Sequence, residues 1–164
     1  MITTKKASQF DISIIQDLAR RSWEDAYAEI LSKDQLEYML DKMYSEHEIM
    51  SHFQNPNYHY FLIFEKETPL GFVGFEHHVE SDITKLHRIY LVPEAKGKGA
   101  GKIGLNLVKE KTKENLDSKI ILTVNKNNSA RQFYESQGFK VYDEAVFDIG
   151  NNYVMDDYLM EFDI

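Results

Sequence analysis

The stretch Leu91-Val92-Pro93-Glu94-Ala95-Lys96-Gly97-Lys98-Gly99-Ala100-Gly101-Lys102 decides the fold that we expect for this chain. Three glycines lie within five residues, between a run rich in β-forming residues (86–92) and a helix-like run (103–114). Glycine lets a backbone approach a ligand closely, because it has no Cβ atom. A strand, a glycine-rich turn and a helix N-terminus present free N–H groups and a positive dipole end. The pattern predicts a seat for phosphate, with an ordinary glycine-rich turn as the alternative.

The charge pattern around this loop favours a ligand with anionic groups. The chain has a net charge of −8, yet residues 94–114 hold six lysines against three glutamates. Residues 23–50 hold eight acidic residues against two lysines, and residues 141–164 hold seven with no lysine or arginine. Because an acidic protein binds a nucleic acid backbone poorly, we expect no nucleic acid partner. The distribution suits a ligand that brings anionic groups to the loop and a cationic group elsewhere, unless the charged runs are only solvated faces.

Length and composition predict a single domain over residues 1–164. With no cysteine, the chain has no disulfide, no thiol nucleophile and no cysteine-bound zinc. We expect no metal site, because there is no His-x-x-x-His pattern and the adjacent His77 and His78 would point to opposite faces of a strand. The first residues lack the apolar core of a signal peptide, and no apolar run approaches the roughly 18 residues of a membrane span. We therefore expect a cytoplasmic protein with no membrane partner.

Hydrophobic periodicity predicts the element order β, α, α, β, β, β, α, β, α, β, β. Asp11 and Ser32 are predicted helix caps, and Ser45 begins a further capping pattern. Three strands joined by short turns predict an antiparallel meander. The nearly all-apolar run 119–124 predicts a strand buried on both faces, reached by one parallel crossover. The predicted strands span 2–8, 58–66, 70–79, 84–92, 119–124, 139–147 and 152–162.

This order indicates a mixed α+β domain with a mainly antiparallel sheet and one βαβ crossover. A Rossmann fold is disfavoured, because only one crossover is present and the loop lacks the first glycine of G-x-G-x-x-G. The loop is not a Walker loop, because no Gly-Lys-Ser/Thr ends it.

Three stretches resemble the GCN5-related N-acetyltransferases, the GNAT superfamily. The segment 90–101, with Lys96-Gly97-Lys98-Gly99-Ala100-Gly101, looks like the family's pyrophosphate loop, Arg/Gln-x-x-Gly-x-Gly/Ala, with lysine in the first position. Residues 122–127 resemble the next strand and its asparagine. Residues 127–139 are similar to the signature Asn-x-x-Ala-x-x-Phe-Tyr-x-x-x-Gly-Phe. The three motifs at this spacing are specific in combination, and the element order matches over the whole chain.

The resemblance implies an acyl-CoA N-acyltransferase fold whose central strands splay where the pantetheine arm of acetyl-CoA, the acyl donor, inserts. Backbone groups of Leu91 and Val92 would bond this arm, and the amides of 97–102 would hold the pyrophosphate. Asn127 would contact the pantetheine and Tyr134 would lie near the thioester sulfur; the alternatives are a plain helix cap and a core aromatic. The implied cofactor-binding residues are Leu91, Val92, Lys96, Gly97, Lys98, Gly99, Ala100, Gly101, Lys102, Asn127 and Tyr134.

The implied chemistry is direct attack by an amine on the thioester. Tyr134 would protonate the leaving thiolate, and a backbone N–H of the segment 91–92 would stabilise the oxyanion. His87 is the candidate base, because strand alternation places it on the face of Ile89 and Leu91. A half-buried structural histidine is the equal alternative, and Glu24, Tyr27 and Glu76 are weaker candidates for the base.

The acceptor would lie against the early helices and the last hairpin, where Trp23, Tyr27, Tyr38 and Asp156 are the candidate substrate-binding residues. These stretches are faintly similar to bacterial polyamine acetyltransferases of the PaiA-like type, which suggests a small cationic amine or a peptide amine. The alternative is that the aromatics are core and the acids are solvated. A non-catalytic CoA-binding module and a nucleotide-binding protein of another fold remain competing functions, and a homodimer stays open.

Overall fold

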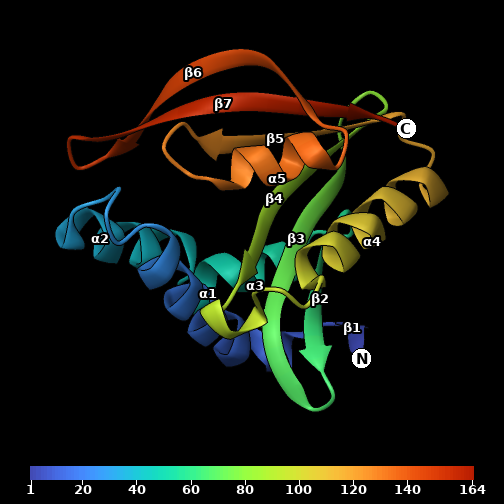
Figure 1. Cartoon of the computed structure of the whole chain (residues 1–164), viewed down its shortest axis with the longest axis horizontal. Coiled ribbons are helices and arrows are strands. Elements are labelled where there is room, and N and C mark those ends of the chain that lie inside the picture. The colour runs from blue at the N-terminus through green and yellow to red at the C-terminus, as the bar shows by residue number, and fades with distance from the viewer.

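The computed structural model describes residues 1–164, and a seven-stranded sheet runs through its centre (Figure 1). The strand order is β1-β2-β3-β4-β5-β7-β6, and β4–β5 is the one parallel pair. The predicted mixed class, with a mainly antiparallel sheet and one crossover, is confirmed. The strands are β1 (Ile2–Lys6), β2 (Tyr58–Glu65), β3 (Thr68–Glu80), β4 (Ile83–Leu91), β5 (Lys119–Asn125), β6 (Lys140–Gly150) and β7 (Tyr153–Asp163).

Helices cover both faces of the sheet (Figure 1). Consecutive residues of β3 show the two faces, because Phe72 meets Tyr44 at the end of α2 whereas Val73 lies against Gly104 of α4. No helix combines the length and apolar character needed to cross a bilayer. The helices are α1 (Ile12–Ala26), α2 (Lys33–Met43), α3 (Glu46–Phe53), α4 (Ala100–Glu114) and α5 (Ala130–Ser136).

The helix caps agree with the sequence in two cases and differ in one. Ser32 and Ser45 each accept a hydrogen bond from the backbone N–H three residues on, at 3.1 Å. The Ser45 pattern forms α3, so three helices precede the meander where the predicted order had two. Asp11 was expected to cap α1, but its carboxylate accepts from the backbone N–H of Ser8 at 2.9 Å. A 3-10 turn precedes α1 and moves the cap one turn earlier.

The central strands splay, as the resemblance implied. β4 and β5 pair only over three residues each, Ile83–Lys85 with Lys119–Ile121. Beyond this point β4 continues along β3, whereas β5 continues along β7 as far as Asn125. The two strands therefore separate toward the end of β4 that feeds the glycine-rich loop.

A β-bulge in β4 lies inside the splayed part. Gly74 of β3 pairs with Arg88, whereas its neighbour Phe75 pairs with Leu86. His87 is therefore an extra residue that has no partner of its own. A bulge breaks the alternation of side chains along a strand and re-aims the residues around it.

The bulge turns His87 away from the face that strand alternation predicted. Its ring stacks on Tyr58 at 5.0 Å between centroids, and Tyr58 in turn stacks on a histidine of α3. Ile89 instead lies against Gly104 of α4, on the opposite face of the sheet. The prediction that His87 shares a face with Ile89 and Leu91 is therefore wrong.

The expected burial of β5 on both faces is also wrong. Ile120, Leu122 and Val124 are buried, but Ile121 is half-buried and Thr123 is exposed. The splay leaves this second face open beside β4, so the apolar run has one covered face.

Candidate active site

The glycine-rich loop leads into a helix start with free backbone donors. Gly97 and Gly99 have φ angles of 78° and 75°, which glycine adopts without Cβ strain. Gly99 is the N-cap of α4, and no side chain caps this helix. The N–H groups of Gly99, Ala100, Gly101 and Lys102 donate to no acceptor in the protein. These donors converge at the positive end of the helix dipole and suit a phosphate group.

A groove of about 280 Å³ runs along this loop. Three of the predicted cofactor-binding residues lie outside it: Lys98, whose Nζ binds Glu65 Oε1 at 2.9 Å, Asn127, and Tyr134. Lys96 Nζ lies 3.8 Å from Asp25 Oδ2, whereas Lys102 makes no ion pair. Lys102 is therefore the lysine of the loop that is free to meet an anion. The groove is lined by Leu91, Val92, Ala95, Lys96, Gly97, Gly99, Ala100, Gly101, Lys102 and Phe133.

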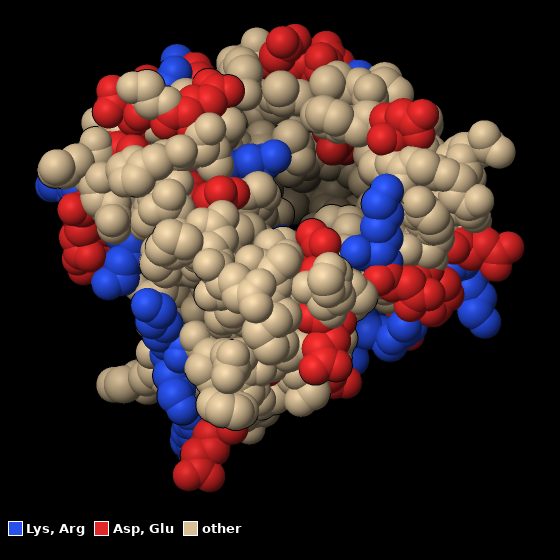
Figure 2. All heavy atoms as spheres, turned by 180° about the vertical axis from the view of Figure 1, so that it is seen from behind, with Lys and Arg blue, Asp and Glu red and all other residues tan.

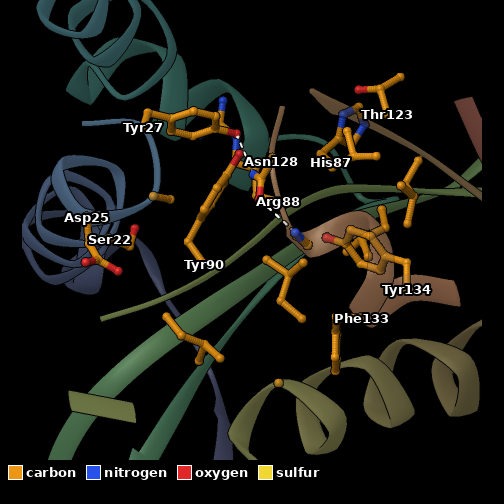
Figure 3. Close-up of a pocket in the computed structure, with 18 residues that line it drawn as sticks. Ser22, Asp25, Tyr27, His87, Arg88, Tyr90, Thr123, Asn128, Phe133 and Tyr134 are labelled. Atoms are coloured by element: carbon orange, nitrogen blue, oxygen red, sulfur yellow. Dashed lines mark hydrogen bonds between the residues drawn. The ribbon is translucent and has the colours of Figure 1, made fainter. Parts of the chain in front are cut away.

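A second cavity, of about 210 Å³, fills the splay between β4 and β5. Its walls come from the end of α1, from β4 and β5, and from α5 (Figure 3). Leu91, Gly101 and Phe133 line both this cavity and the groove, so the two spaces meet there. An elongated ligand can therefore lie with phosphate at the loop and its far end in the splay. The polar residues of the cavity are Ser22, Asp25, Tyr27, His87, Arg88, Tyr90, Thr123, Asn128 and Tyr134.

The backbone of Leu91, and not that of Val92, is available in the splay. The N–H of Val92 donates to Leu70 O at 2.9 Å, and its carbonyl accepts from Ala95 N at 3.0 Å. In an antiparallel ladder the next residue directs its backbone groups to the opposite edge. The backbone N–H and C=O of Leu91 therefore point toward β5, and the pairing of β4 with β5 has already ended at Lys85. The N–H of Val92 is therefore not free to bond the pantetheine arm, and only its carbonyl oxygen keeps a lone pair for a further hydrogen bond.

Tyr134 lines the cavity from α5, as expected. Its side chain is buried beside the rings of Phe133 and Phe139, and its hydroxyl makes no hydrogen bond within the protein. Burial raises the pKa of Tyr134 well above its usual range, and the nearby Tyr27 raises it further. The phenol is therefore protonated at neutral pH and can donate a proton.

His87 lines the same cavity as part of a dyad with Glu76. Its Nε2 lies 3.0 Å from Glu76 Oε1, and Glu76 Oε2 accepts from the side chain of Asn55 at 3.1 Å. A carboxylate only accepts, so the imidazole donates its Nε2 proton and keeps Nδ1 as an acceptor. Burial lowers the pKa of His87 to about 4, although Glu76 opposes this. The ring is therefore neutral at neutral pH.

Tyr27 and Asn128 join opposite sides of the cavity. Asn128 Nδ2 donates to the Tyr27 hydroxyl at 3.4 Å, and Asn128 Oδ1 accepts from the first amide of α5, that of Ala130, at 2.9 Å (Figure 3). Asn128 thus lies in the cavity wall where the resemblance had placed Asn127. The Asx pattern two residues before the helix was the signal for it, and Asn127 itself lines neither space.

The other predicted acceptor residues lie outside the cavity. Trp23 is 1% exposed and packs among three tyrosine rings, so it belongs to the core. The Tyr38 hydroxyl donates to Ile149 O at 3.0 Å and holds the last hairpin. Asp156 Oδ1 lies 3.0 Å from Lys126 Nζ. Of the four candidates, only Tyr27 lines the space in the splay.

Arg88 is a buried residue of the cavity that the sequence did not indicate. Its guanidinium lies 4.2 Å from the centre of the Tyr44 ring, and Nη1 donates to the Tyr60 hydroxyl at 3.1 Å. Arginine is usually exposed, and the hydrophobic pattern does not mark this one as buried, although strand alternation places it on the same face as Tyr90. Seen from behind, the surface is hollowed near its centre, with acidic and basic side chains around the hollow (Figure 2).

Comparison with known proteins identifies the family. Residues 27–155 match the acetyltransferase (GNAT) domain model. The spermidine N(1)-acetyltransferase of Thermoplasma acidophilum is 28% identical over 160 residues, which cover 94% of this chain and 96% of the relative. The PaiA N-acetyltransferase of that organism, solved in complex with coenzyme A, superposes with a TM-score of 0.87 at 27% identity, covering 100% of this chain and 99% of the other.

A more distant enzyme shares the fold. The ribosomal-protein-S18-alanine N-acetyltransferase from Escherichia coli has a TM-score of 0.75 at 19% identity, covering 100% of this chain and 94% of the other. The free amides of the loop and the passage into the splay agree with the family match. The chain therefore belongs to the GNAT acetyltransferase family and is an acetyl-CoA-dependent N-acetyltransferase.

Proposed function

We propose that this protein transfers the acetyl group of acetyl-CoA to a primary amine of a small cationic molecule, with a polyamine as the leading candidate, by direct attack. The observation that carries the proposal is the passage from the glycine-rich loop to the cavity that holds Tyr134 and His87. Acetyl-CoA supplies an activated acetyl group as its thioester. No residue of the cavity is a thiol nucleophile, since the chain has no cysteine.

Three parts of the loop would bind the donor. The free amides of 99–102 would hold the pyrophosphate, with the ammonium of Lys102 beside them. Leu91 would offer its N–H to the thioester carbonyl oxygen, where negative charge develops during attack. A preorganised backbone donor of this kind costs no rearrangement when the charge appears.

The two proton transfers would fall to residues on opposite sides of the cavity. Tyr134, kept protonated by its burial, would give its proton to the leaving thiolate. His87, kept neutral and oriented by Glu76, would receive a proton from the acceptor amine at Nδ1, directly or through water. The low pKa of His87 makes it a weak base. Most acceptor molecules would therefore lose the ammonium proton before the neutral amine attacks the thioester.

Two observations support a cationic acceptor. The end of α1, which lines the cavity, opens the acidic stretch 23–50, and the acidic last hairpin pairs with β5, which lines the cavity from the other side. In addition, a relative that matches over nearly the whole chain is a spermidine N(1)-acetyltransferase.

The proposal is tested by incubating the protein with acetyl-CoA and a panel of amines, and measuring released thiol. The panel contains spermidine, spermine, putrescine, lysine and short peptides with a free N-terminus. We expect a polyamine to give the highest kcat/KM, and mass spectrometry of the product to locate a primary amine. If acetyl-CoA binds but no amine exceeds the hydrolysis background, the chain is a CoA-binding module instead. If only peptides react, the acceptor class is wrong.

A further inference from the structure

Asp157 is an acidic residue of the last hairpin that lies in the interior of the protein. It sits on β7, between Asn125 of β5 and Ala145 of β6. Only 7% of the residue is exposed, whereas the preceding Asp156 is an exposed surface residue. The sequence pattern Met-Asp-Asp-Tyr does not distinguish the two aspartates, and only the sheet shows which one is inside.

The carboxylate of Asp157 has no partner in the protein. Oδ1 is buried without a hydrogen bond, and neither oxygen takes part in a hydrogen bond or an ion pair. Lys126 directly follows Asn125, the partner of Asp157 on β5, but its ammonium is already bound to Asp156 and Glu144. Burying a carboxylate without donors is unfavourable, and buried charges are normally paired. Burial, with the neighbouring Asp156, raises the pKa of Asp157 to about 6.

The sheet register places this carboxylate beside the cavity. Cross-strand partners present their side chains on the same face, so Asp157 shares a face with Asn125, and Leu159 with Thr123. Thr123 lines the cavity, and Asp157 is its diagonal neighbour, at about 7 to 8 Å between Cα atoms. On the other side, the negative charge of Asp157 contributes to the raised pKa of Tyr27, which also lines the cavity.

We propose that Asp157 binds an ammonium group of the acceptor, beside the wall that Thr123 and Tyr27 form. The inference rests on the proposed function and names a residue for it. An ammonium carries the donors and the positive charge that this carboxylate lacks, and the Asp157 oxygens are acceptors only. Because no group of the protein pairs with this carboxylate, its oxygens are free to bind the ammonium of the acceptor. An apolar or anionic acceptor would leave the carboxylate unpaired.

The experiment compares wild type with Asp157→Asn, which keeps the shape and removes the charge. Asp163→Asn is the matched control, because it removes one charge from the far end of the same strand, where the side chain is exposed and lies 3.9 Å from Lys119 Nζ. We expect Asp157→Asn to raise the KM for spermidine at least tenfold, with the KM for acetyl-CoA within twofold of wild type. We expect Asp163→Asn to match wild type for both substrates. A spermidine KM for Asp157→Asn that rises less than threefold would overturn the proposal.

A binding measurement keeps this inference separate from the question of turnover. Calorimetric titration of spermidine into the protein saturated with coenzyme A should show binding by wild type and a loss of at least tenfold in affinity for Asp157→Asn. Asp157→Glu, which retains the charge, should recover part of the affinity, and melting curves establish that each variant is folded. No spermidine binding by wild type, or equal binding by Asp157→Asn, would refute the role of Asp157. Binding without acetylation would refute the proposed function alone.

Discussion

At the scale of single residues, the burial of a side chain matters as much as its type for the chemistry of the cavity. Tyr134 and Asp157 are both buried without hydrogen-bond partners, and burial raises the pKa of both. For the phenol, the shift secures the protonated form that a proton donor needs. For the carboxylate, it moves the pKa toward neutrality and leaves an acceptor that an ammonium can satisfy. The chain contains ten tyrosines, and their number says nothing about which one faces the thioester.

Replacing Tyr134 with phenylalanine should slow the reaction without weakening the donor's binding. The substitution removes a proton donor but keeps the ring that packs against Phe133 and Phe139. We expect kcat to fall about 100-fold or more, in line with the loss of a general acid, while the dissociation constant for acetyl-CoA stays within about twofold. Steady-state kinetics and calorimetry measure the two. Tyr142→Phe, at an exposed position of β6, serves as the control. An unchanged kcat in Tyr134→Phe would remove this residue from the mechanism.

At the scale of elements, the joint between the loop and α4 controls access to the cavity. Gly101 lies in the first turn of α4, and a Cβ atom built on it would meet Phe133 at 3.3 Å and Leu91 at 3.4 Å. All three residues line both the groove and the cavity. The absence of a side chain at Gly101 therefore keeps the passage open where the two spaces meet.

Substituting Gly101 with valine should narrow that passage. The two γ-methyl groups would extend into space that Phe133 and Leu91 already border, so we expect the dissociation constant for acetyl-CoA to rise at least tenfold, a loss of about 1.4 kcal/mol of binding free energy. Gly101→Ala needs a shift of only a few tenths of an ångström from its neighbours and should have a smaller effect. Calorimetric titration with coenzyme A measures both variants. Wild-type affinity in the valine variant would show that the donor does not pass Gly101.

At the scale of the whole molecule, a buried polar network stabilises the end of the sheet where β4 and β5 are still paired. Asp117, at the turn before β5, accepts from the Thr84 hydroxyl at 2.7 Å and from the backbone N–H of His78 at 3.0 Å. Because the Thr84 proton goes to Asp117, His77 donates its Nδ1 proton to Thr84 Oγ1, 2.8 Å away. The network joins β3, β4 and the turn before β5 beside the three residue pairs that β4 and β5 share, and these two strands separate beyond Lys85.

This network predicts a loss of stability in mild acid. Burial lowers the pKa of His77 to about 4, from an ordinary value near 6.5. Because the pKa of this histidine is higher in the unfolded chain, the unfolded chain binds the proton at a higher pH than the folded protein does. The contribution of neutral His77 to stability is therefore complete above pH 6.5 and is lost as the pH falls toward 4. His87 acts in the same direction, whereas protonation of Asp157 below its raised pKa opposes it. We expect the protonation of His77 alone to lower the free energy of unfolding by about 2 kcal/mol between pH 7 and pH 5.

Thermal unfolding of wild type and His77→Gln at pH 7 and pH 5 measures this contribution. The glutamine variant does not titrate, so its melting temperature should fall less between the two pH values than that of wild type. For each protein, the quantity compared is the fall in its own melting temperature from pH 7 to pH 5. A loss of stability that is the same at both pH values therefore does not affect the comparison. Equal falls in both proteins would contradict the role of His77.

Features of this protein that depend on residues close together in the chain could be predicted from its amino-acid sequence. Short turns between strand-like runs predicted the meander, the strand–helix–strand order predicted the crossover, and the glycine spacing predicted a tight loop before a helix. These features rest on local backbone preferences and on side chains within one turn or one strand. Only the tertiary structure showed the bulge that turns His87, the use of the Val92 N–H within the sheet, and the place of Asn128, not Asn127, in the cavity wall. It also decided that Asp157 lies inside while Asp156 meets Lys126, because burial depends on strands far apart in the chain.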